Sequence, residues 1–297
     1  MDAALDIQNL CFTFPDGTGI QDISLQVKRG DIYGLFGGHH AGKTVLLQTM
    51  IGTLRPQSGV LKLFGNEEYE QEKRRIGYVP QTPLSIGRMT IADTFRYFSL
   101  SYGILEGKIE KALALNPNEK KPVCRLPLSI QRLVNLGIAL LGGPDLVFMD
   151  APFAGLDAEE SDRLLSILSF LNEDRRITFF LTGQDYASFS RIATRYGVLA
   201  NGKLLAELTP AELEERCKRC IKIKTAQLSR AIPVLAPHFS DYEVLADDLI
   251  RVFCPLSCSA QINTMLTLAG VEVSEIWIAG MEPQEYLSKL AGGEAID

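Results

Sequence analysis

The chain has 297 residues, of which 46% are hydrophobic and 22% are charged, and its formal net charge is −6 at pH 7. This length suits one large domain with a small one, and the acidic balance argues against a nucleic-acid partner, which normally requires a basic face. No signal-like apolar segment follows Met1, and the longest uncharged stretch, Val252–Val271, carries too many polar residues for a membrane span. A role at a membrane is therefore expected only as a peripheral subunit.

The N-terminal part of the chain is predicted to form two strands, followed by a strand, a loop and a helix. Residues 7–14 and 20–27 alternate apolar and polar side chains, residues 31–36 suit a buried strand, and residues 45–51 suit a helix. The loop between the last two is Gly37-Gly38-His39-His40-Ala41-Gly42-Lys43-Thr44, which fits the phosphate-binding pattern Gly-x-x-x-x-Gly-Lys-Thr.

This octapeptide predicts a nucleotide site because it lies between a strand and a helix. Backbone N–H groups of the loop and the positive end of the following helix would face the phosphates. Lys43 would reach the β- and γ-phosphates, and Thr44 would bind Mg²⁺.

The next elements alternate between strands and helices, as in an α/β protein with a buried parallel sheet. Strands are predicted at 59–64, 76–79, 146–149, 177–181, 198–199 and 203–208, and helices at 90–114 with an interruption near 102–103, at 133–141, 159–171 and 186–194, and after Thr209. The strand 146–149 is closed by Asp150, as expected for a buried strand that ends at a site.

After about residue 218 the predicted order becomes β-α-β-β-α-β, which is compatible with a small ferredoxin-like domain. Its strands are predicted at 221–225, 242–245, 249–253 and 273–279, and its helices at 228–236 and 260–268, with a further short helix at 283–290. The spacing of Cys217, Cys220, Cys254 and Cys258 would allow a zinc site if the fold joined the two pairs; otherwise they are reduced, half-buried thiols.

Four segments make the chain resemble the ATP-binding subunit of ABC transporters from about Leu5 to Leu208. They are the phosphate loop, Gly77-Tyr78-Val79-Pro80-Gln81, Leu146–Asp150 and Gly155-Leu156-Asp157, and the ending Glu285-Tyr286-Leu287 … Gly292-Gly293-Glu294 is similar to the tail of drug and peptide-antibiotic exporters. The resemblance implies an α/β fold with a P-loop ABC-type ATPase core, an antiparallel β subdomain and a helical subdomain at about 84–142. This domain would cover residues 1–217, and the small α+β domain residues 218–297.

The resemblance also implies roles for single residues. Phe14 would stack on adenine, or else face the core as a strand residue. Gln81 would sense Mg²⁺ and the γ-phosphate and couple to the membrane subunit, Asp150 would hold Mg²⁺ mostly through water, and Asp157 would lie at the seam of a dimer. Together with residues 37–44 they form the predicted ATP and Mg²⁺ site, with Thr44, Gln81 and Asp150 on the metal.

Several positions depart from the family pattern. Ala151 stands where the family has the glutamate that polarises the attacking water, so this general base is missing. Gln184 replaces a histidine that contacts the γ-phosphate, and it can donate a hydrogen bond but carries no charge. Arg125–Ser129 replaces the signature Leu-Ser-Gly-Gly-Gln, and in it Leu126 has no hydroxyl where the signature has serine and Pro127 has no N–H. His39 and His40 could close over the phosphates, add charge when protonated, obstruct the site, or face solvent.

These losses predict an exporter-type subunit that binds Mg·ATP and hydrolyses it weakly or not at all in isolation. It would be a cytoplasmic protein, peripheral on the inner face of the cell membrane, beneath an integral-membrane permease and paired with a second, intact ABC ATPase subunit rather than with a copy of itself. Two alternatives stay open. One is an active ATPase of a homodimeric exporter, with a base such as Asp185 or a partner residue; the other is a non-hydrolysing regulatory or scaffold module.

Overall fold

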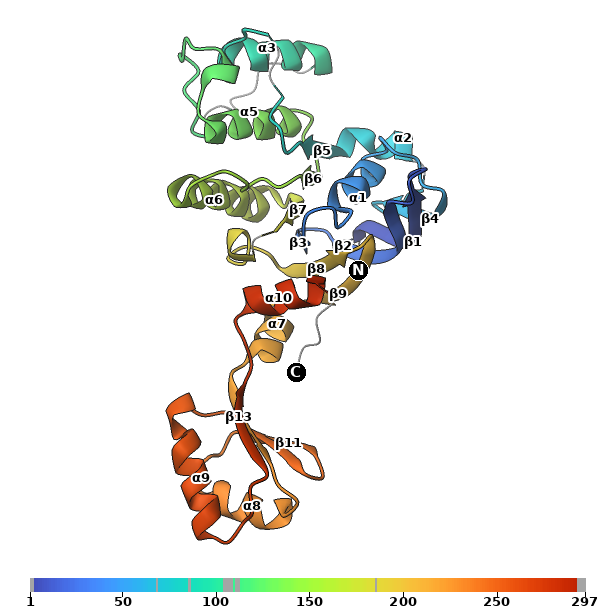
Figure 1. The fold of residues 1–297 in the computed structure, drawn as a ribbon. Helices are drawn as coiled ribbons and strands as arrows, with labels where there is room; N and C mark the ends of the chain where they lie inside the picture. Colours follow the sequence, from blue (N-terminus) through green and yellow to red (C-terminus); the bar gives the residue numbers. More distant parts are fainter. Residues whose placement is uncertain are drawn as a thin grey trace. The chain divides into compact units, whose positions relative to one another are not determined.

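The computed structural model describes residues 3–67, 69–84, 87–103, 109, 113–184 and 186–292 (Figure 1). The chain divides into two compact units, Met1–Pro210 with Leu287–Glu294, and Ala211–Tyr286 with Ala295–Asp297. The boundary expected between residues 217 and 218 lies at the end of helix α7 (Pro210–Cys217), whereas the chain passes from the first unit to the second at the start of this helix.

The first unit begins with an antiparallel sheet of three strands in the order β2-β1-β4. These strands are β1 (Ala3–Thr13), β2 (Gly19–Lys28) and β4 (Ser58–Leu63). In β2 every second side chain from Ile23 to Val27 is buried, as the alternation in the sequence predicts. A short helix α2 (Tyr69–Glu72) and a 3₁₀ turn η1 (Lys73–Arg75) follow β4 and lead into the second sheet.

The second sheet has six strands in the order β5-β6-β7-β3-β8-β9. Their bounds are β3 (Ile32–Phe36), β5 (Ile76–Val79), β6 (Leu146–Met149), β7 (Thr178–Gly183), β8 (Arg195–Ala200) and β9 (Lys203–Leu208). The pairs from β5 to β8 are parallel, and only the hairpin β8–β9 is antiparallel. Strands β3 and β6 are buried at every residue, which explains their continuous apolar sequences.

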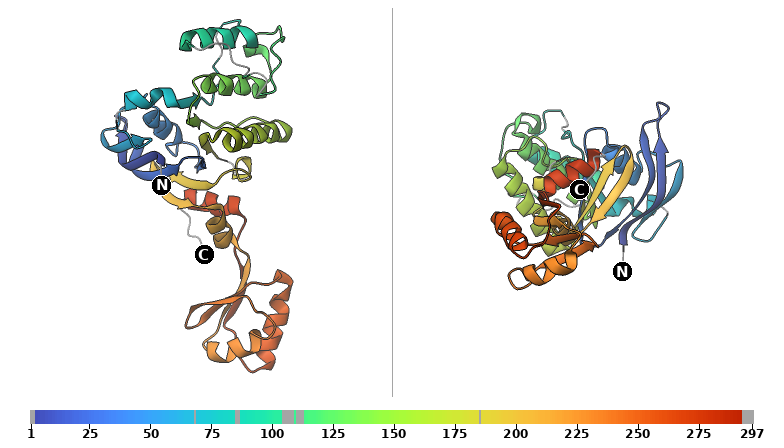
Figure 2. Two further views of the ribbon diagram at one scale, coloured as in Figure 1. Left: turned by 180° about the vertical axis from the view of Figure 1, so that it is seen from behind. Right: turned by 60° about the horizontal axis from the view of Figure 1, so that its bottom comes forward.

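Helix α1 (Lys43–Met50) lies between the two sheets and joins them into one core. Its side chains Leu46, Leu47 and Met50 are fully buried among residues of both sheets. Helix α6 (Ala158–Arg175) covers the opposite side of the six-stranded sheet, as the two views in Figures 1 and 2 agree. Parallel strands covered by helices on both faces are the arrangement expected of an α/β nucleotide-binding domain.

The helical part of this unit contains α3 (Ile91–Tyr102), a 3₁₀ turn η2 (Val123–Arg125) and α5 (Leu128–Leu140). Helix α3 starts with a capping box at Thr90 and ends at Gly103 with φ 67°, so the interruption expected near 102–103 is its end. Residues 104–108 and 110–112 of the predicted helix 90–114 lie outside the described residues. Helix α5 starts five positions before the predicted Leu133, directly after Pro127, whose fixed φ suits a helix entrance.

The helix predicted at 186–194 is wrong. The chain forms only a 3₁₀ turn η3 (Tyr186–Ser188) and then separate turns, in which Ser190 N–H donates to Tyr186 O and Ala193 N–H donates to Phe189 O. Phe189 is fully buried against β3 and β7, and the chain has to turn to place it there. Packing of one aromatic ring therefore overrides the helical pattern of the sequence.

The second unit contains β10 (Cys220–Lys224), α8 (Leu228–Leu235), β11 (Tyr242–Ala246), β12 (Leu249–Val252), η4 (Leu256–Cys258), α9 (Ser259–Leu268) and β13 (Glu275–Ala279). The sheet order β11-β12-β10-β13, with every pair antiparallel, confirms the ferredoxin-like topology. Ile221 and Ile223 of β10 share a separate core with α8 and α9. The last helix, α10 (Pro283–Gly292), follows β13.

Within the described ranges, no three His, Cys, Asp or Glu side chains gather in a way that could hold a metal ion. Cys217, Cys220, Cys254 and Cys258 are free thiols. Burial raises the pKa of Cys217 to about 11, which disfavours the thiolate that zinc requires. No helix in the described part of the chain combines the length and apolarity needed to cross a bilayer.

Candidate nucleotide site

The phosphate loop connects β3 to α1 and carries one buried cation. Lys43 is 9% exposed, and its Nζ donates to the carbonyl oxygens of Gly37 at 2.8 Å and Gly38 at 2.6 Å. Burial lowers the pKa of this ammonium, and the negative charge of Asp150 acts in the opposite direction. Within the described residues, the loop thus holds a cation that donates to two backbone carbonyls, and phosphate oxygens are stronger acceptors for it.

A chain of hydrogen bonds fixes the carboxylate of Asp150. Thr44 Oγ1 donates to Asp150 Oδ2 at 3.0 Å, and Thr182 Oγ1 donates to Asp150 Oδ1 at 2.7 Å. Thr182 also accepts the backbone N–H of Ala151 at 3.0 Å. A hydroxyl and a carboxylate in contact are oxygen ligands of the kind that Mg²⁺ prefers, so the residues present fit this ion.

The back of the phosphate loop is braced by two distant turns. Gly202, in the β8–β9 hairpin, donates its N–H to Ala41 O at 3.0 Å and accepts the N–H of Gln21 at 2.8 Å. A Cβ atom on Gly202 would lie 2.3 Å from the carbonyl oxygen of Gly19, at the start of β2. Only glycine allows this approach, and Gly42 packs against the same two turns with φ 102°.

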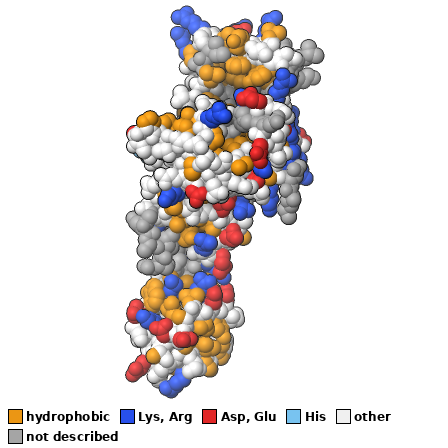
Figure 3. Space-filling view, turned by 90° about the vertical axis from the view of Figure 1, so that its right-hand side faces the viewer, with side chains coloured by type: hydrophobic (Ala, Val, Ile, Leu, Met, Phe, Trp, Pro, Cys, Tyr) orange, Lys and Arg blue, Asp and Glu red, His pale blue; other side chains and the backbone are white. Residues whose placement is uncertain are grey.

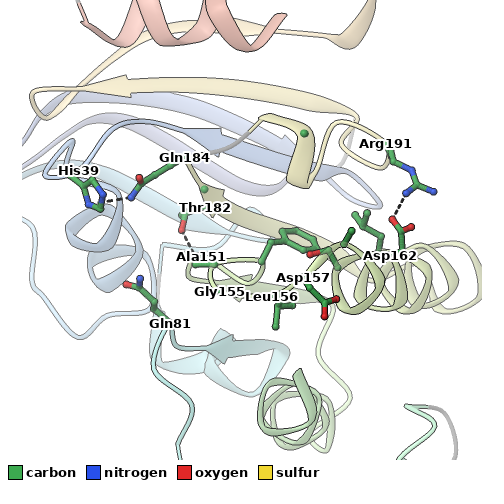
Figure 4. Close-up of a pocket in the computed structure, with 17 residues that line it drawn as sticks. His39, Gln81, Ala151, Gly155, Leu156, Asp157, Asp162, Thr182, Gln184 and Arg191 are labelled. Carbon is green, nitrogen blue, oxygen red and sulfur yellow. Dashed lines mark hydrogen bonds and ion pairs between the residues drawn. The ribbon is translucent and has the colours of Figure 1, made fainter. Parts of the chain in front are cut away.

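A cavity of about 690 Å³ opens from the phosphate loop along the start of α6 (Figure 4). At the loop end it is lined by His39, Gln81, Ala151, Thr182 and Gln184. Gln184 Nε2 lies 3.3 Å from His39 Nδ1. The structure thus brings together the predicted γ-phosphate residues Gln81 and Gln184, the missing-base position Ala151 and one of the two loop histidines.

The side chain of Phe189 anchors the segment that carries Gln184. The ring is fully buried, and a Cβ on Gly34 or Gly183 would approach it to 2.7 Å and 2.6 Å. The absence of side chains at these two glycines, one on β3 and one on β7, therefore leaves the space that this ring fills. Gln184 directly follows Gly183, the last residue of β7, which pairs with Phe36 just before the phosphate loop.

The N-terminus of α5, at the altered signature, is closed by neighbouring side chains. Leu126 is only 9% exposed, so it is packed inward. Ser129 Oγ donates to Glu160 Oε1 at 2.5 Å, and Gln131 Nε2 donates to Leu126 O at 2.8 Å. A carboxylate stands where the positive end of a helix would otherwise attract phosphate. Leu128 Cδ2 also lies within 3.4 Å of a Cβ built on Gly155.

The remaining predicted residues lie around this centre. Asp157 lines the cavity and caps α6, where it accepts the N–H of Glu160 at 2.8 Å. Phe14 is half-buried at the end of β1, and its ring packs edge-on against Phe12 at 4.8 Å between centroids. His40 is exposed and has φ 61°. Asp185, the alternative base, lies outside the described residues.

Sequence reasoning missed three residues that shape the site: Thr182, Phe189 and Glu160. Thr182 follows the apolar run of β7 and could have been recognised as a hydroxyl at the carboxyl end of a buried strand, where parallel sheets place their sites. Glu160 stands three positions after Asp157, the spacing of a capping box, but its contact with Ser129 joins segments far apart in the chain. The sequence carries no local signal for that contact.

A strand–loop–helix cradle with a buried lysine, beside a threonine–aspartate pair at the same edge of a parallel sheet, defines a P-loop nucleoside-triphosphate-binding protein. Comparison with known proteins narrows this class. The family model described as ABC transporter matches residues 20–154.

Among curated relatives, the bacitracin transport ATP-binding protein BcrA of Bacillus licheniformis is 27% identical over 286 residues, which cover 93% of this chain and 94% of that protein. The Nod factor export ATP-binding protein I of Bradyrhizobium diazoefficiens is also 27% identical and covers 89% of both chains. The solved structure of cbiO1 from Clostridium perfringens, part of an ABC transporter complex, has a TM-score of 0.64 at 21% identity over 72% of this chain and 92% of that one. Residues 20–154 thus match the ABC transporter family, and the chain as a whole is similar to ATP-binding subunits of ABC transporters.

Proposed function

We propose that this subunit binds Mg·ATP, hydrolyses it slowly or not at all by itself, and transmits ATP-dependent closure to a membrane permease of the drug or peptide export type. It would work with a second, catalytically intact ATPase subunit on the inner face of the membrane. Lys43 would hold the β- and γ-phosphates, and Thr44, Gln81 and Asp150 would hold Mg²⁺, which would neutralise phosphate charge. The retained Lys43, Thr44 and Asp150 contacts support the binding half of this proposal.

The observation that carries the proposal is the absence of a base where one is needed. Among the described residues at the loop end of the cavity, none is a carboxylate that faces the open space, because Asp150 is 4% exposed and bonded to two threonines. Ala151 has φ 44°, and its N–H is bonded to Thr182. Loss of a general base typically lowers a rate by about 10²–10⁴-fold.

The closed N-terminus of α5 supports the need for a partner. A homodimer would present Leu126, Pro127 and the Glu160 carboxylate at both sites, so neither site would receive hydroxyl and N–H donors from the opposed chain. Loss of such donors costs about 10²–10³-fold more. A heterodimer with an intact subunit leaves the partner's loop and base available for turnover, although this chain's altered segment faces them.

The export assignment is supported by the names of the relatives, which include bacitracin transport and Nod factor export proteins. A permease contact is proposed at Gln81 and the helices between Thr90 and Leu115. Figure 3 shows apolar side chains at the surface of the helical end of the first unit, and the large exposed apolar residues of α3 include Tyr97, Leu100 and Tyr102. Apolar groups exposed together commonly mark an interface.

The test compares nucleotide binding with turnover in the purified full chain. Calorimetric titration with Mg·ATP should show binding that Lys43→Ala removes and that Lys28→Ala, on the exposed side of β2, leaves unchanged. Steady-state phosphate release should stay at the level of the Lys43→Ala variant. Native purification from membranes should yield a permease and an intact ATPase with the chain.

Other outcomes would favour the alternatives. Robust turnover by wild type that Lys43→Ala abolishes would support an active ATPase. A native complex with two copies of this chain, no other ATPase and full transport would support a homodimeric exporter. Absence of Mg·ATP binding at millimolar concentration would support the regulatory or scaffold module.

A further inference from the structure

We propose that His39, held by Gln184, contacts the terminal phosphate of ATP in addition to Lys43, and that its protonation tunes the preference for triphosphate over diphosphate. This inference rests on the proposed function, because it refines how the site binds nucleotide. The two side chains contact each other at 3.3 Å across the mouth of the phosphate loop, where they line the same cavity as Gln81 and Ala151 (Figure 4).

The direction of the cavity places His39 at the terminal-phosphate end. The β-phosphate belongs near Lys43 and the N-terminus of α1, and Mg²⁺ belongs near Thr44 and Asp150. His39 lies before these residues in the loop, on the side that opens to Ala151 and Thr182 at the ends of β6 and β7. A third phosphate that extends from the cradle into the cavity therefore meets the imidazole.

Lys43 is the fixed positive charge of the loop, and His39 can add a second one. Gln81 and Gln184, which line the cavity with His39, are neutral amides, and the ring of His40 lies 6.4 Å away between centroids. The nearby charges of Lys43 and Asp150 are bonded to loop carbonyls and to two threonines. The other charged residues that line the cavity are Asp157, Asp162 and Arg191, at its α6 end, where Arg191 and Asp162 form an ion pair. Within the described residues at the loop end of this lining, His39 is the only ionisable side chain.

The amide of Gln184 can form a hydrogen bond with His39 in both protonation states of the imidazole. Its amide donates to the ring nitrogen when His39 is neutral, and after rotation its carbonyl oxygen accepts the N–H when His39 is protonated. Pairing of Gly183 with Phe36 places the neighbouring Gln184 beside the loop. Gln184 is thus a positioning residue, and the charge that a histidine on β7 would supply comes instead from the loop itself.

The experiment measures nucleotide affinity and proton uptake at pH 6 and pH 8. The full chain is titrated with Mg²⁺ and either a non-hydrolysable ATP analogue or ADP, in two buffers of different ionisation enthalpy. A protonated histidine favours the triphosphate, so affinity for the analogue should fall about three- to fivefold from pH 6 to pH 8, the range for a partly exposed charge pair. Binding of the analogue should take up protons. Binding of ADP should show little pH dependence and little proton uptake.

Variants separate the inference from general effects of pH. His39→Asn should abolish the pH dependence and the proton uptake, and Gln184→Ala should weaken both. His238→Asn, in the second unit and outside the predicted nucleotide site, is the control and should keep them. A wild-type slope that persists in His39→Asn, or tighter analogue binding by that variant, would overturn the inference and leave the proposed function intact. Failure of wild type to bind either nucleotide would overturn both.

Discussion

At the scale of residues, the proposed magnesium end of the site depends on the hydroxyl of Thr182, which lies outside the recognised motifs. Thr182 donates to Asp150 and accepts from the backbone of Ala151, so it links two strand ends with one oxygen. Asp150 has its second oxygen bonded to Thr44. A carboxylate held by two hydroxyls cannot rotate freely, and it therefore presents a fixed edge to a cation.

Replacing Thr182 by valine keeps the shape of the side chain and removes these two hydrogen bonds. We expect Mg·ATP affinity to fall about tenfold, since losing a hydrogen bond to a charged group costs about 1.5 kcal/mol. Calorimetric titration with and without Mg²⁺ checks this. Thr182→Ser should retain most of the affinity, and an equal loss in the absence of Mg²⁺ would contradict a role through Asp150.

A second prediction at the residue scale concerns hydrolysis by the variant Ala151→Glu. We expect this variant to gain little hydrolysis by itself, below about tenfold, because the closed N-terminus of α5 would still oppose the site. Combining it with Leu126→Ser, Pro127→Gly and Leu128→Gly should give the larger gain. Phosphate release at saturating Mg·ATP measures both, and strong activity of the single variant would refute the importance assigned to α5.

At the scale of elements, the segment after β7 shows how far a sequence can specify a site. The phosphate loop, the buried strands and the ferredoxin-like order follow from local patterns, because motif spacing and periodicity are local properties. The helix expected at 186–194 does not form, since the space left by Gly34 and Gly183 attracts Phe189, and strand pairing decides which glycines become neighbours. The Ser129–Glu160 contact is non-local in the same way.

This packing predicts a coupling between Gly34 and Phe189. Gly34→Ala should lower the free energy of unfolding by about 1–3 kcal/mol, because the added methyl group overlaps the ring. Phe189→Ala alone should cost about 3–5 kcal/mol. In urea unfolding of the full chain, the double variant should lose less unfolding free energy than the sum of the losses of the two single variants. Gly142→Ala, whose nearest neighbour would lie 3.7 Å away, is the control, and strict additivity would argue against the contact.

At the scale of the whole molecule, two clusters of buried hydrophobic residues in the described part of the chain share no residue. One joins α1 to both sheets of the first unit, and the other lies between β10 and the helices α8 and α9. Units with separate cores can unfold in separate steps. The nucleotide residues all belong to the first unit, so a ligand acts directly on the stability of that unit alone.

We therefore expect two thermal unfolding transitions in calorimetry. Mg·ATP should raise the midpoint temperature of the first unit's transition only. At a free concentration of about 100 times Kd, binding stabilises the first unit by about 2.7 kcal/mol. Ile223→Ala should lower the free energy of unfolding of the second unit by about 2–4 kcal/mol and leave nucleotide affinity unchanged. A single transition that shifts as a whole with ligand would show instead that the two units unfold together.

The brace behind the phosphate loop has a consequence for biosynthesis. The motif ends at Thr44, but the turn that supports it contains Gly202, and the strands β7 and β8 that flank β3 begin at Thr178 and Arg195. A nascent chain that has emerged as far as α6 carries the complete loop sequence without the backbone that holds it. Domains fold as units during synthesis, so we expect the chain to become able to bind nucleotide only after the β8–β9 hairpin has emerged, and ATP to have no effect on shorter intermediates.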